Sequence, residues 1–471
     1  MSIVVTPVSC PVVTMIHGLM SLLSCAQVTL HDVVHHEDLE AMVQLNFTVD
    51  LSFLMSHVHP RVRNRIPITV IHGHKFPESI QAIKTAAKQW PNIRLISPFL
   101  SNRFGTHHTK AMLLFFNKNG TKTAQVAIMT ANMCRGDWED MTQGIYLSPR
   151  CPLKEDAPSP VPGTLINSDY GSPFERQLIE YLKTYSPSLM DICATLRLYD
   201  WSQCKVILIG SVPGYHREHQ FAKWGLERLS RALRDYVQLP PECCRESTLI
   251  AQCSSMAKFT QQWFQKDFAT KLSNAANASE ARPPHLRCVY PSVRDVAQSH
   301  TGIISSAGFL RFEQEIYDQS REWFDSHLCR WQSEKAGRQK VMPHIKTYTR
   351  VYGPDNDPQI AWHLLTSANL SRAAWGEYQK NKTQLFIKSY ELGVLICPSL
   401  WQTEEISEVC LVPSTVPNPH PASSSKEGPC LTVPIRLPYD LPLTPHEQPG
   451  QCYTRRYAQQ AMERFGGIEL E

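Results

Sequence analysis

The feature that most constrains the fold of this chain is an internal repeat, in which the same residue types recur in the same order 236 to 241 positions apart. The first copy contains His108, Lys110, Asn132, Arg135 and Trp138, followed by Thr-Gln-Gly-Ile-Tyr at 142–146. The second copy contains His344, Lys346, Asn369, Arg372 and Trp375, followed by Thr-Gln-Leu-Phe-Ile at 383–387. The repeat therefore predicts two homologous halves that face each other across a pseudo-two-fold axis.

Short apolar runs rich in β-branched residues alternate with amphipathic segments. Residues 67–73 are typical of a buried strand and 77–90 of an amphipathic helix. Further strands are predicted at 93–99, 110–116, 124–132, 142–148, 206–211, 360–369 and 384–397. This alternation predicts an α/β class with two similar α/β domains and one shared active site. We expect an atypical segment at 1–27, a first half at 28–202 and a second half at 203–471, whose last 25 or so residues are atypical.

Composition narrows the range of partners and compartments. Lys and Arg number 47 against 43 Asp and Glu, so the net charge of +4 excludes a polybasic coat, and a nucleic acid has to be bound in a local groove. The 15 Cys form no C-x-x-C pair, which predicts a reducing compartment rather than a disulfide scaffold or a zinc site. Residues 1–27 are apolar but lack the basic start of a secretory signal and are too broken to span a bilayer, so no membrane association is expected. Two Pro-rich stretches, 149–173 and 413–449, predict surface loops or connectors.

The repeated residues indicate phosphate chemistry. In H-x-K on a strand, both side chains point to the same face, because side chains alternate along a strand. Two copies that meet at an axis place two His, two Lys and two Asn in one cleft. Lys and Asn donate hydrogen bonds to phosphodiester oxygens, which leaves the two His for nucleophilic attack and proton transfer without a metal ion. A single H-x-K is an ordinary strand pattern, and its duplication is what points to catalysis. For His107 and for the repeated Arg and Trp residues, structural roles are the favoured interpretation.

Longer motifs around these residues resemble the tyrosyl-DNA phosphodiesterases of the phospholipase D superfamily, in a fungal-type form with atypical termini. The resemblance covers roughly Val28 to Leu443 and rests on the motifs at 104–114, 137–145, 208–214, 290–293, 342–348, 366–376 and 389–395. It implies two phospholipase D-like domains with mixed sheets flanked by helices. The wider superfamily has an Asp five positions after each motif Lys. Phe115 and Val351 occupy those positions here, which disfavours the phospholipase subtype.

Other departures from the family lie near the ends of the matched region. Ser52 and Phe53 stand where an Asp and a Trp are expected. Pro449 is followed by Gly450 where the family has a Pro-Trp pair. The resemblance therefore predicts an intact site between atypical termini.

The resemblance implies a role for each site residue. His108 is the expected nucleophile and His344 the general acid and base. The phosphate is clamped by Lys110, Lys346, Asn132 and Asn369. Gln143 and Glu391 orient the two His, and the sequence leaves open which residue serves which His. Phe104 is either a platform for a DNA base or a core residue, and DNA-backbone contacts are expected from Ser254, Ser255 and Ser371.

The resemblance also implies an activity. We expect a metal-independent DNA-repair phosphodiesterase, without a cofactor, that hydrolyses 3′-phosphotyrosyl and other 3′ adducts through a phosphohistidine intermediate. The expected partners are single- or double-stranded DNA 3′ ends that carry a tyrosyl peptide derived from topoisomerase IB. A monomer located in the nucleus is expected. The alternatives are another phosphodiesterase or nuclease of the superfamily, and a catalytically inactive DNA-binding homologue.

Overall fold

The computed structural model describes residues 28–155, 171–185, 187–414, 430–448 and 450–464, and the backbone of 14–16. The rest of the atypical N-terminal segment, the centres of both Pro-rich stretches and the last seven residues lie outside these ranges, so the expectations for them stay predictions. Among the described residues, no helix combines the length and the hydropathy of a membrane span.

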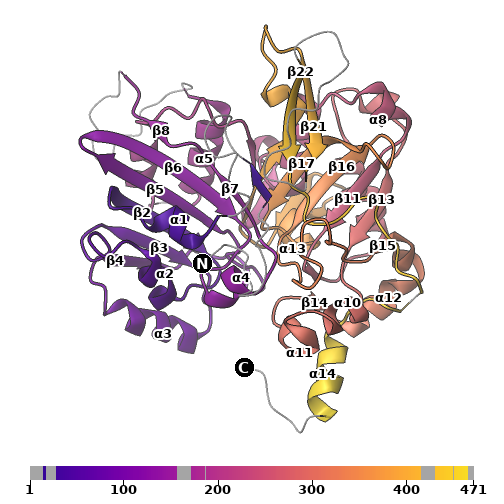
Figure 1. Ribbon diagram of the computed structural model, residues 1–471, viewed down its shortest axis with the longest axis horizontal. Coiled ribbons are helices and arrows are strands. Elements are labelled where there is room, and N and C mark those ends of the chain that lie inside the picture. The colour runs from indigo at the N-terminus through magenta and orange to yellow at the C-terminus, as the bar shows by residue number, and fades with distance from the viewer. Residues whose placement is uncertain are drawn as a thin grey trace.

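Two sheets of mixed strand direction stand side by side, one from each half of the sequence (Figure 1). The first contains β1 (Thr14–Ile16), β2 (Leu39–Asn46), β3 (Ile68–His72), β4 (Ile93–Ile96), β5 (Ala111–Lys118), β6 (Thr121–Met129), β7 (Gly144–Leu147) and β8 (Cys151–Pro152). The second contains β9 (Ile207–Ser211), β11 (Thr248–Gln252), β13 (His285–Val289), β15 (Leu328–Cys329), β16 (Thr347–Tyr352), β17 (Gln359–Thr366), β20 (Glu391–Ile396), β21 (Glu408–Pro413) and β22 (Cys430–Ile435). Two small sheets contain β10 (Gly214–Arg217), β18 (Glu377–Gln379) and β19 (Gln384–Ile387), and β12 (Ser255–Met256) and β14 (Arg311–Phe312).

The two large sheets share one topology. In the first, six neighbouring strands run in the order β4-β3-β2-β5-β6-β7, and in the second the order is β15-β13-β11-β16-β17-β20. In both, the first three strands are parallel to one another and each later neighbour is antiparallel. The chain is therefore an α/β protein built from two equivalent halves, as the repeat predicts.

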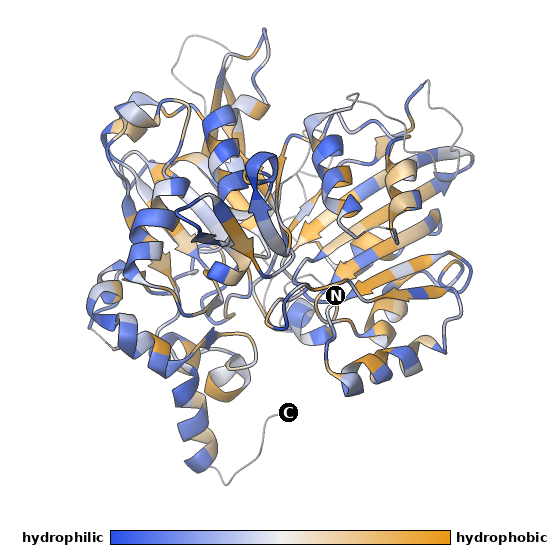
Figure 2. Ribbon diagram, turned by 180° about the vertical axis from the view of Figure 1, so that it is seen from behind, coloured by the Kyte–Doolittle hydropathy of each residue, from blue (hydrophilic) through white to orange (hydrophobic). Residues whose placement is uncertain are grey.

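Helices cover the sheets. They are α1 (Leu30–Val34), α2 (Leu51–His57), α3 (Pro77–Ala87), α4 (Arg135–Glu139), α5 (Pro173–Lys183), α6 (Met190–Leu196), α7 (Gly225–Tyr236), α8 (Pro241–Arg245), α9 (Ala269–Leu272), α10 (Val293–Ala297), α11 (Gly302–Ser306), α12 (Gln314–Phe324), α13 (Arg372–Trp375) and α14 (Arg455–Arg464). Hydrophobic residues are concentrated in the strands, whereas the helices are largely hydrophilic on their outer sides (Figure 2). One apolar core cluster contains residues of both sheets and so joins the two halves, and a second lies between the first sheet and α1 to α4.

Local sequence explains the strands that lead to the site. β5 and β6 form a hairpin whose turn is Asn119-Gly120, and both residues have positive φ values, of 53° and 88°. This dipeptide is the one that a two-residue turn of twisted strands favours. Six successive residues of β5, from Ala111 to Phe116, are buried, because the strand lies at the centre of its sheet. The strand thus fixes the His-His-Thr-Lys segment that precedes it.

The structure corrects one part of the sequence repeat. Thr-Gln-Leu-Phe-Ile at 383–387 was paired above with Thr-Gln-Gly-Ile-Tyr, but Gln384–Ile387 forms β19 of a small sheet rather than the counterpart of β7. The strand that occupies the position of β7 is β20, since Met129 pairs with Ile145 as Thr366 pairs with Gly393.

Counting back two residues from those pairs makes Gln143 the counterpart of Glu391. The mismatch arose because the second half carries an inserted hairpin between α13 and β20, which repeats the Thr-Gln letters by chance.

Candidate active site

The two motif His residues lie directly before the equivalent central strands β5 and β16. Each is held by a main-chain hydrogen bond from the opposite half. The amide of His108 donates to the carbonyl of Tyr390 (3.0 Å), and the amide of His344 donates to the carbonyl of Thr142 (2.9 Å). The two acceptors directly precede Glu391 and Gln143, so each half presents its orienting residue to the His of the other half.

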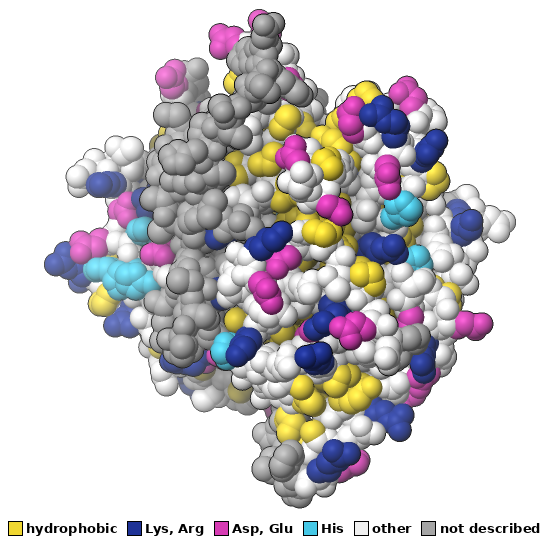
Figure 3. Space-filling model, turned by 45° about the vertical axis from the view of Figure 1, so that its right-hand side comes forward, with side chains coloured by type: hydrophobic (Ala, Val, Ile, Leu, Met, Phe, Trp, Pro, Cys, Tyr) yellow, Lys and Arg dark blue, Asp and Glu magenta, His cyan; other side chains and the backbone are white. Residues whose placement is uncertain are grey.

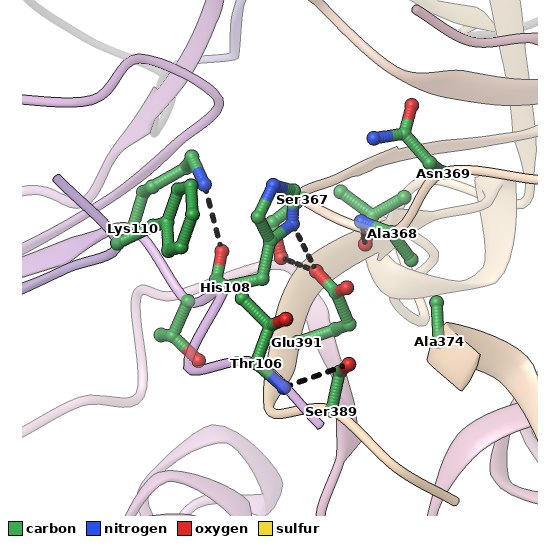
Figure 4. A network of polar contacts seen from close by, with 12 residues as sticks. Thr106, His108, Lys110, Ser367, Ala368, Asn369, Ala374, Ser389 and Glu391 are labelled. Atoms are coloured by element: carbon green, nitrogen blue, oxygen red, sulfur yellow. Dashed lines mark hydrogen bonds and ion pairs between the residues drawn. The ribbon is translucent and has the colours of Figure 1, made fainter. Parts of the chain in front are cut away.

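His108 is oriented by Glu391. Its Nδ1 lies 2.8 Å from Oε2 of Glu391, and the same oxygen accepts a 2.6 Å hydrogen bond from the hydroxyl of Ser367 (Figure 4). Burial on its own raises the pKa of Glu391, but His108, Ser367 and Lys110 outweigh it, so the carboxylate stays ionised. Burial lowers the pKa of His108, and Glu391 offsets this only in part. A neutral imidazole whose Nδ1 proton is held by Glu391 exposes the lone pair of Nε2.

His344 is oriented by a carboxylate that the sequence reasoning missed. Its Nδ1 lies 2.9 Å from Oδ2 of Asp137 and 2.9 Å from Nε2 of Gln143. The amide of Gln143 and the N–H of the ring are both donors, so only Asp137 can accept from His344. Gln143 instead donates to the same Asp137 oxygen (2.9 Å), and its own carbonyl accepts from the hydroxyl of Thr130 (2.7 Å).

The electrostatics of this second pair favour an ionised carboxylate beside a neutral ring. Burial alone raises the pKa of Asp137, but His344 and the amide of Asn132 lower it well below its usual range. Burial and then Lys346 lower the pKa of His344 to about 3, against the opposing effect of Asp137. Burial and the neighbouring Lys346 therefore both oppose protonation of His344, whereas Asp137 favours it.

The question that the sequence left open thus has a geometric answer. Glu391 contacts His108, whereas Gln143 acts on His344 chiefly through Asp137. Asp137 lies five residues after Asn132, and the corresponding residue after Asn369 is Ala374. A buried carboxylate where the other copy has Ala was a usable signal, as were the duplicated hydroxyls of Thr130 and Ser367 two residues before each Asn.

The two motif Lys residues are buried next to the His residues. Each ammonium donates a hydrogen bond to the carbonyl of its own His, at 3.0 Å for Lys110, which leaves further N–H donors on each. Burial lowers the pKa of Lys110 to about 8. Burial and the repulsion from Lys110 lower the pKa of Lys346 well below its usual range. Two buried ammoniums that repel each other favour an anionic ligand such as a phosphodiester.

The two Asn side chains are anchored by their oxygen atoms. Oδ1 of Asn369 accepts from the amides of Ser254 (3.1 Å) and Ser255 (3.0 Å), so its amide nitrogen is turned to the side that faces His108 (Figure 4). Oδ1 of Asn132 accepts from the amide of Thr48 at 3.4 Å, but its nitrogen also lies 3.2 Å from Asp137. The surroundings of the two Asn are therefore less symmetric than the repeat implies.

The remaining predicted contact residues differ in exposure. Phe104 is 64% exposed, with the guanidinium of Arg103 4.6 Å from its ring centroid, so the core-packing alternative is wrong and a base platform stays a prediction. Ser254 is fully buried against Asn369, and Ser255 is half-buried. Ser371 is half-buried and caps α13 by accepting from the amide of Ala374. Ser254 supports Asn369, and a DNA contact by any of the three Ser residues stays a prediction.

The interpretation of His107 and of both Trp residues as structural agrees with their burial. His107 is buried between the carbonyl of Asn46 and the hydroxyl of Tyr185, and Trp138 and Trp375 are 2% and 1% exposed. Within the part of the chain that the structure describes, no three His, Cys, Asp or Glu side chains gather as metal ligands. Lys and Arg side chains are interspersed with Asp and Glu on the face shown in Figure 3, in line with the small net charge.

Comparison with known proteins gives a consistent family. The tyrosyl-DNA phosphodiesterase family model matches residues 12–447. Tyrosyl-DNA phosphodiesterase 1 of Drosophila melanogaster is 32% identical over 92% of this chain and 71% of its own length, and that of Arabidopsis thaliana is 33% identical over 85% and 63%. The chain thus spans about two thirds of these relatives. A crystal structure of yeast tyrosyl-DNA phosphodiesterase superposes with a TM-score of 0.65 at 18% identity, covering 92% of this chain and 97% of that one, and shares the fold.

Proposed function

Because the chain belongs to the tyrosyl-DNA phosphodiesterase family, we propose that it hydrolyses the bond between a tyrosyl peptide and a DNA 3′ phosphate. The observation that carries this proposal is the crossed arrangement of the site. His108 is oriented by Glu391 and His344 by Asp137 with Gln143, each from the other half, around two Lys ammoniums. A nucleophile and a proton donor that both lie in the field of the same two Lys suit displacement at phosphorus.

In the first step, Nε2 of His108 attacks phosphorus and the P–O bond to the tyrosine breaks. His344 donates its Nε2 proton to the tyrosine oxygen, whose conjugate acid in solution has a pKa of about 10. Glu391 stabilises the positive charge that develops on His108. The products are a free tyrosyl peptide and a 3′-phosphohistidine on the enzyme.

In the second step, neutral His344 takes a proton from water while the water oxygen attacks phosphorus. The P–N bond to His108 breaks, and DNA leaves with a 3′ phosphate. Lys110, Lys346 and Asn369 donate hydrogen bonds to the non-bridging oxygens in both steps. The bound phosphodiester also offsets the cations that lower the pKa of His344, so substrate binding itself promotes the acid form.

Lipid hydrolysis is the less favoured alternative within the superfamily. The positions that carry an Asp in the phospholipase subtype hold Phe115 and Val351, which are 4% and 8% exposed. Buried apolar side chains supply no carboxylate there. An inactive homologue is disfavoured because both His–carboxylate pairs are assembled.

The finer features of the expected role extend the same proposal. We propose that the tyrosyl peptide derives from topoisomerase IB, that other 3′ adducts are also substrates, and that the protein acts as a monomer in the nucleus. The exposed ring of Phe104 and the half-buried Ser371 support DNA binding, because they lie close in sequence to His108 and Asn369 respectively.

The decisive experiment is incubation with a 3′-phosphotyrosyl oligonucleotide in excess EDTA. We expect release of tyrosine and formation of a 3′-phosphate strand, because the Lys ammoniums neutralise the phosphate without a divalent ion. We expect no turnover of phosphatidylcholine, because Phe115 and Val351 supply no carboxylate. Activity that is lost in EDTA and restored by Mg²⁺ or Zn²⁺ contradicts the mechanism. Binding of the oligonucleotide without turnover favours the inactive homologue.

A further inference from the structure

The three-stranded sheet β10-β19-β18 presents one aromatic and basic face to solvent. Tyr215 of β10 pairs with Phe386 of β19, and their rings stack with centroids 4.5 Å apart and planes 14° apart. Tyr215 is 60% exposed. Lys388 directly follows β19, and its ammonium lies on the same face, 5.8 Å from the Phe386 centroid.

The opposite face of this small sheet is part of the core. His216 is 8% exposed, and Leu385 and Ile387 are fully buried. Only the face that carries Tyr215, Lys388 and Arg217 is therefore open to a partner. Its charge is positive, since the carboxylate of Glu377 on β18 is already paired with a guanidinium, that of Arg372.

This aromatic and basic face adjoins the loop that carries Phe104. Gly105 packs so tightly on the carbonyl of Lys388 that a Cβ there would lie 2.1 Å from the oxygen. The amide of Thr106 donates to the hydroxyl of Ser389 at 3.2 Å. Phe386 lies two residues before Lys388, which is about 7 Å along an extended strand. Starting from His108, the surface thus offers Phe104, then Lys388, then Tyr215 on its Phe386 support.

Exposed aromatic rings interleaved with cations are the chemistry that binds single-stranded DNA, because bases stack on the rings and phosphates pair with the cations. We propose that Tyr215 is a second stacking platform, which binds a base of single-stranded DNA farther from the 3′ end than the base on Phe104. Lys388 contacts the phosphate between the two bases. This inference rests on the proposed function, because the reacting 3′ phosphate at His108 fixes which end of the strand enters the site.

The test compares two 3′-phosphotyrosyl substrates, a dinucleotide and a twelve-nucleotide strand. Loss of one stacked base typically weakens binding by roughly tenfold. We therefore expect Tyr215→Ala to raise KM roughly tenfold for the long strand and to leave its kcat unchanged, while Tyr215→Phe keeps the wild-type KM. The dinucleotide does not reach Tyr215, so its turnover by the Ala variant also confirms that the variant is folded.

Salt dependence tests the role of Lys388 separately. For single strands, each neutralised phosphate contributes about 0.7 to the slope of log affinity against log salt. Lys388→Gln is expected to reduce that slope by about this amount for the long strand. Lys122→Gln is the matched control, because Lys122 is also partly exposed but lies at the far end of β6 from the site, and it is expected to leave the slope unchanged.

Three outcomes overturn the inference. Wild-type KM values that are equal for both lengths show that the protein does not bind the distal strand. A Tyr215→Ala variant whose KM rises equally for both substrates places Tyr215 at the 3′ end or in a structural role. If the Tyr215→Ala variant has the wild-type KM for the long strand, and that KM still differs from the KM for the dinucleotide, the distal strand binds at a surface other than Tyr215. Failure of the wild-type protein to hydrolyse either substrate contradicts the proposed function instead.

Discussion

Replacing Asp137 by Asn tests whether the charge of this carboxylate controls the protonation of His344. Asn keeps an oxygen that can accept from Nδ1 of His344, from Gln143 and from the amide of Asn132, which now lie 2.9, 2.9 and 2.8 Å from Oδ2. The change therefore removes the negative charge and leaves the shape nearly constant. We expect both chemical steps to slow, because each passes through a state in which His344 carries a positive charge.

The magnitude follows from the geometry. Two unit charges about 4 Å apart attract by about 4 kcal/mol at an effective dielectric constant of about 20. The cost of desolvating the buried pair offsets part of this attraction. We therefore expect the variant to lose about 2–4 kcal/mol of transition-state stabilisation, or a factor of about 30 to 10³ in rate. The carboxylate raises the pKa of His344, so its removal lowers that pKa further. The acid form then disappears at a lower pH, and the first step declines earlier as the pH rises.

Single-turnover quenching of a labelled 3′-phosphotyrosyl oligonucleotide resolves tyrosine release from formation of the 3′ phosphate. Both rates are measured between pH 5 and 9 for the wild type and for Asp137→Asn. Asp140→Asn is the control, since Asp140 directly follows the same short helix and is half-buried without an ion pair to His344. A rate within threefold of the wild type refutes the assignment. An equal loss at every pH without a shift of the profile shows that Asp137 only supports the structure.

Three further predictions follow from the cations and from Phe104. Lys110→Ala and Lys346→Ala are each expected to lower kcat by about 10²–10³, measured at saturating substrate, and wild-type kinetics for the Lys346 variant would place the second half away from the phosphate. Burial lowers the pKa of Lys110 to about 8 and that of Lys346 well below its usual range, so kcat/KM is expected to have fallen once the pH has passed about 8, where both ammoniums have lost their protons, and a profile that is flat to pH 10 contradicts this. Phe104→Ala is expected to raise KM roughly tenfold on single-stranded substrate with little change in kcat, and an unchanged KM argues that the ring, although exposed, binds no base.

The sequence predicted the features that short motifs of neighbouring residues determine. Two H-x-K motifs at matched positions indicate two equivalent strands, and the strand order on either side of β5 and β16 agrees. The interpretation of His107 as a structural residue agrees with its burial. These patterns are local, so the letters of the sequence suffice to read them.

The features that sequence could not supply depend on contacts between distant segments. Gln143 and Glu391 occupy equivalent positions in the two halves, which only the strand register shows. The inserted hairpin of β18 and β19 had aligned Gln143 with Gln384 instead. Asp137 lies 207 positions from His344, and its role arises only when the two halves face each other. The exposure of Phe104 likewise depends on how the loop before His108 packs on Lys388, which no local pattern encodes.

The central claim, a covalent intermediate on His108 resolved by His344, is tested most directly on a denaturing gel. Each His→Ala variant is mixed with a labelled 3′-phosphotyrosyl oligonucleotide and quenched. The tyrosine oxygen is a fair leaving group, whereas water is a poor nucleophile, so loss of His344 slows the second step more than the first. The account predicts a shifted covalent band with His344→Ala and none with His108→Ala. A band with His108→Ala reverses the assignment, and no band with either variant contradicts the accumulation of the intermediate.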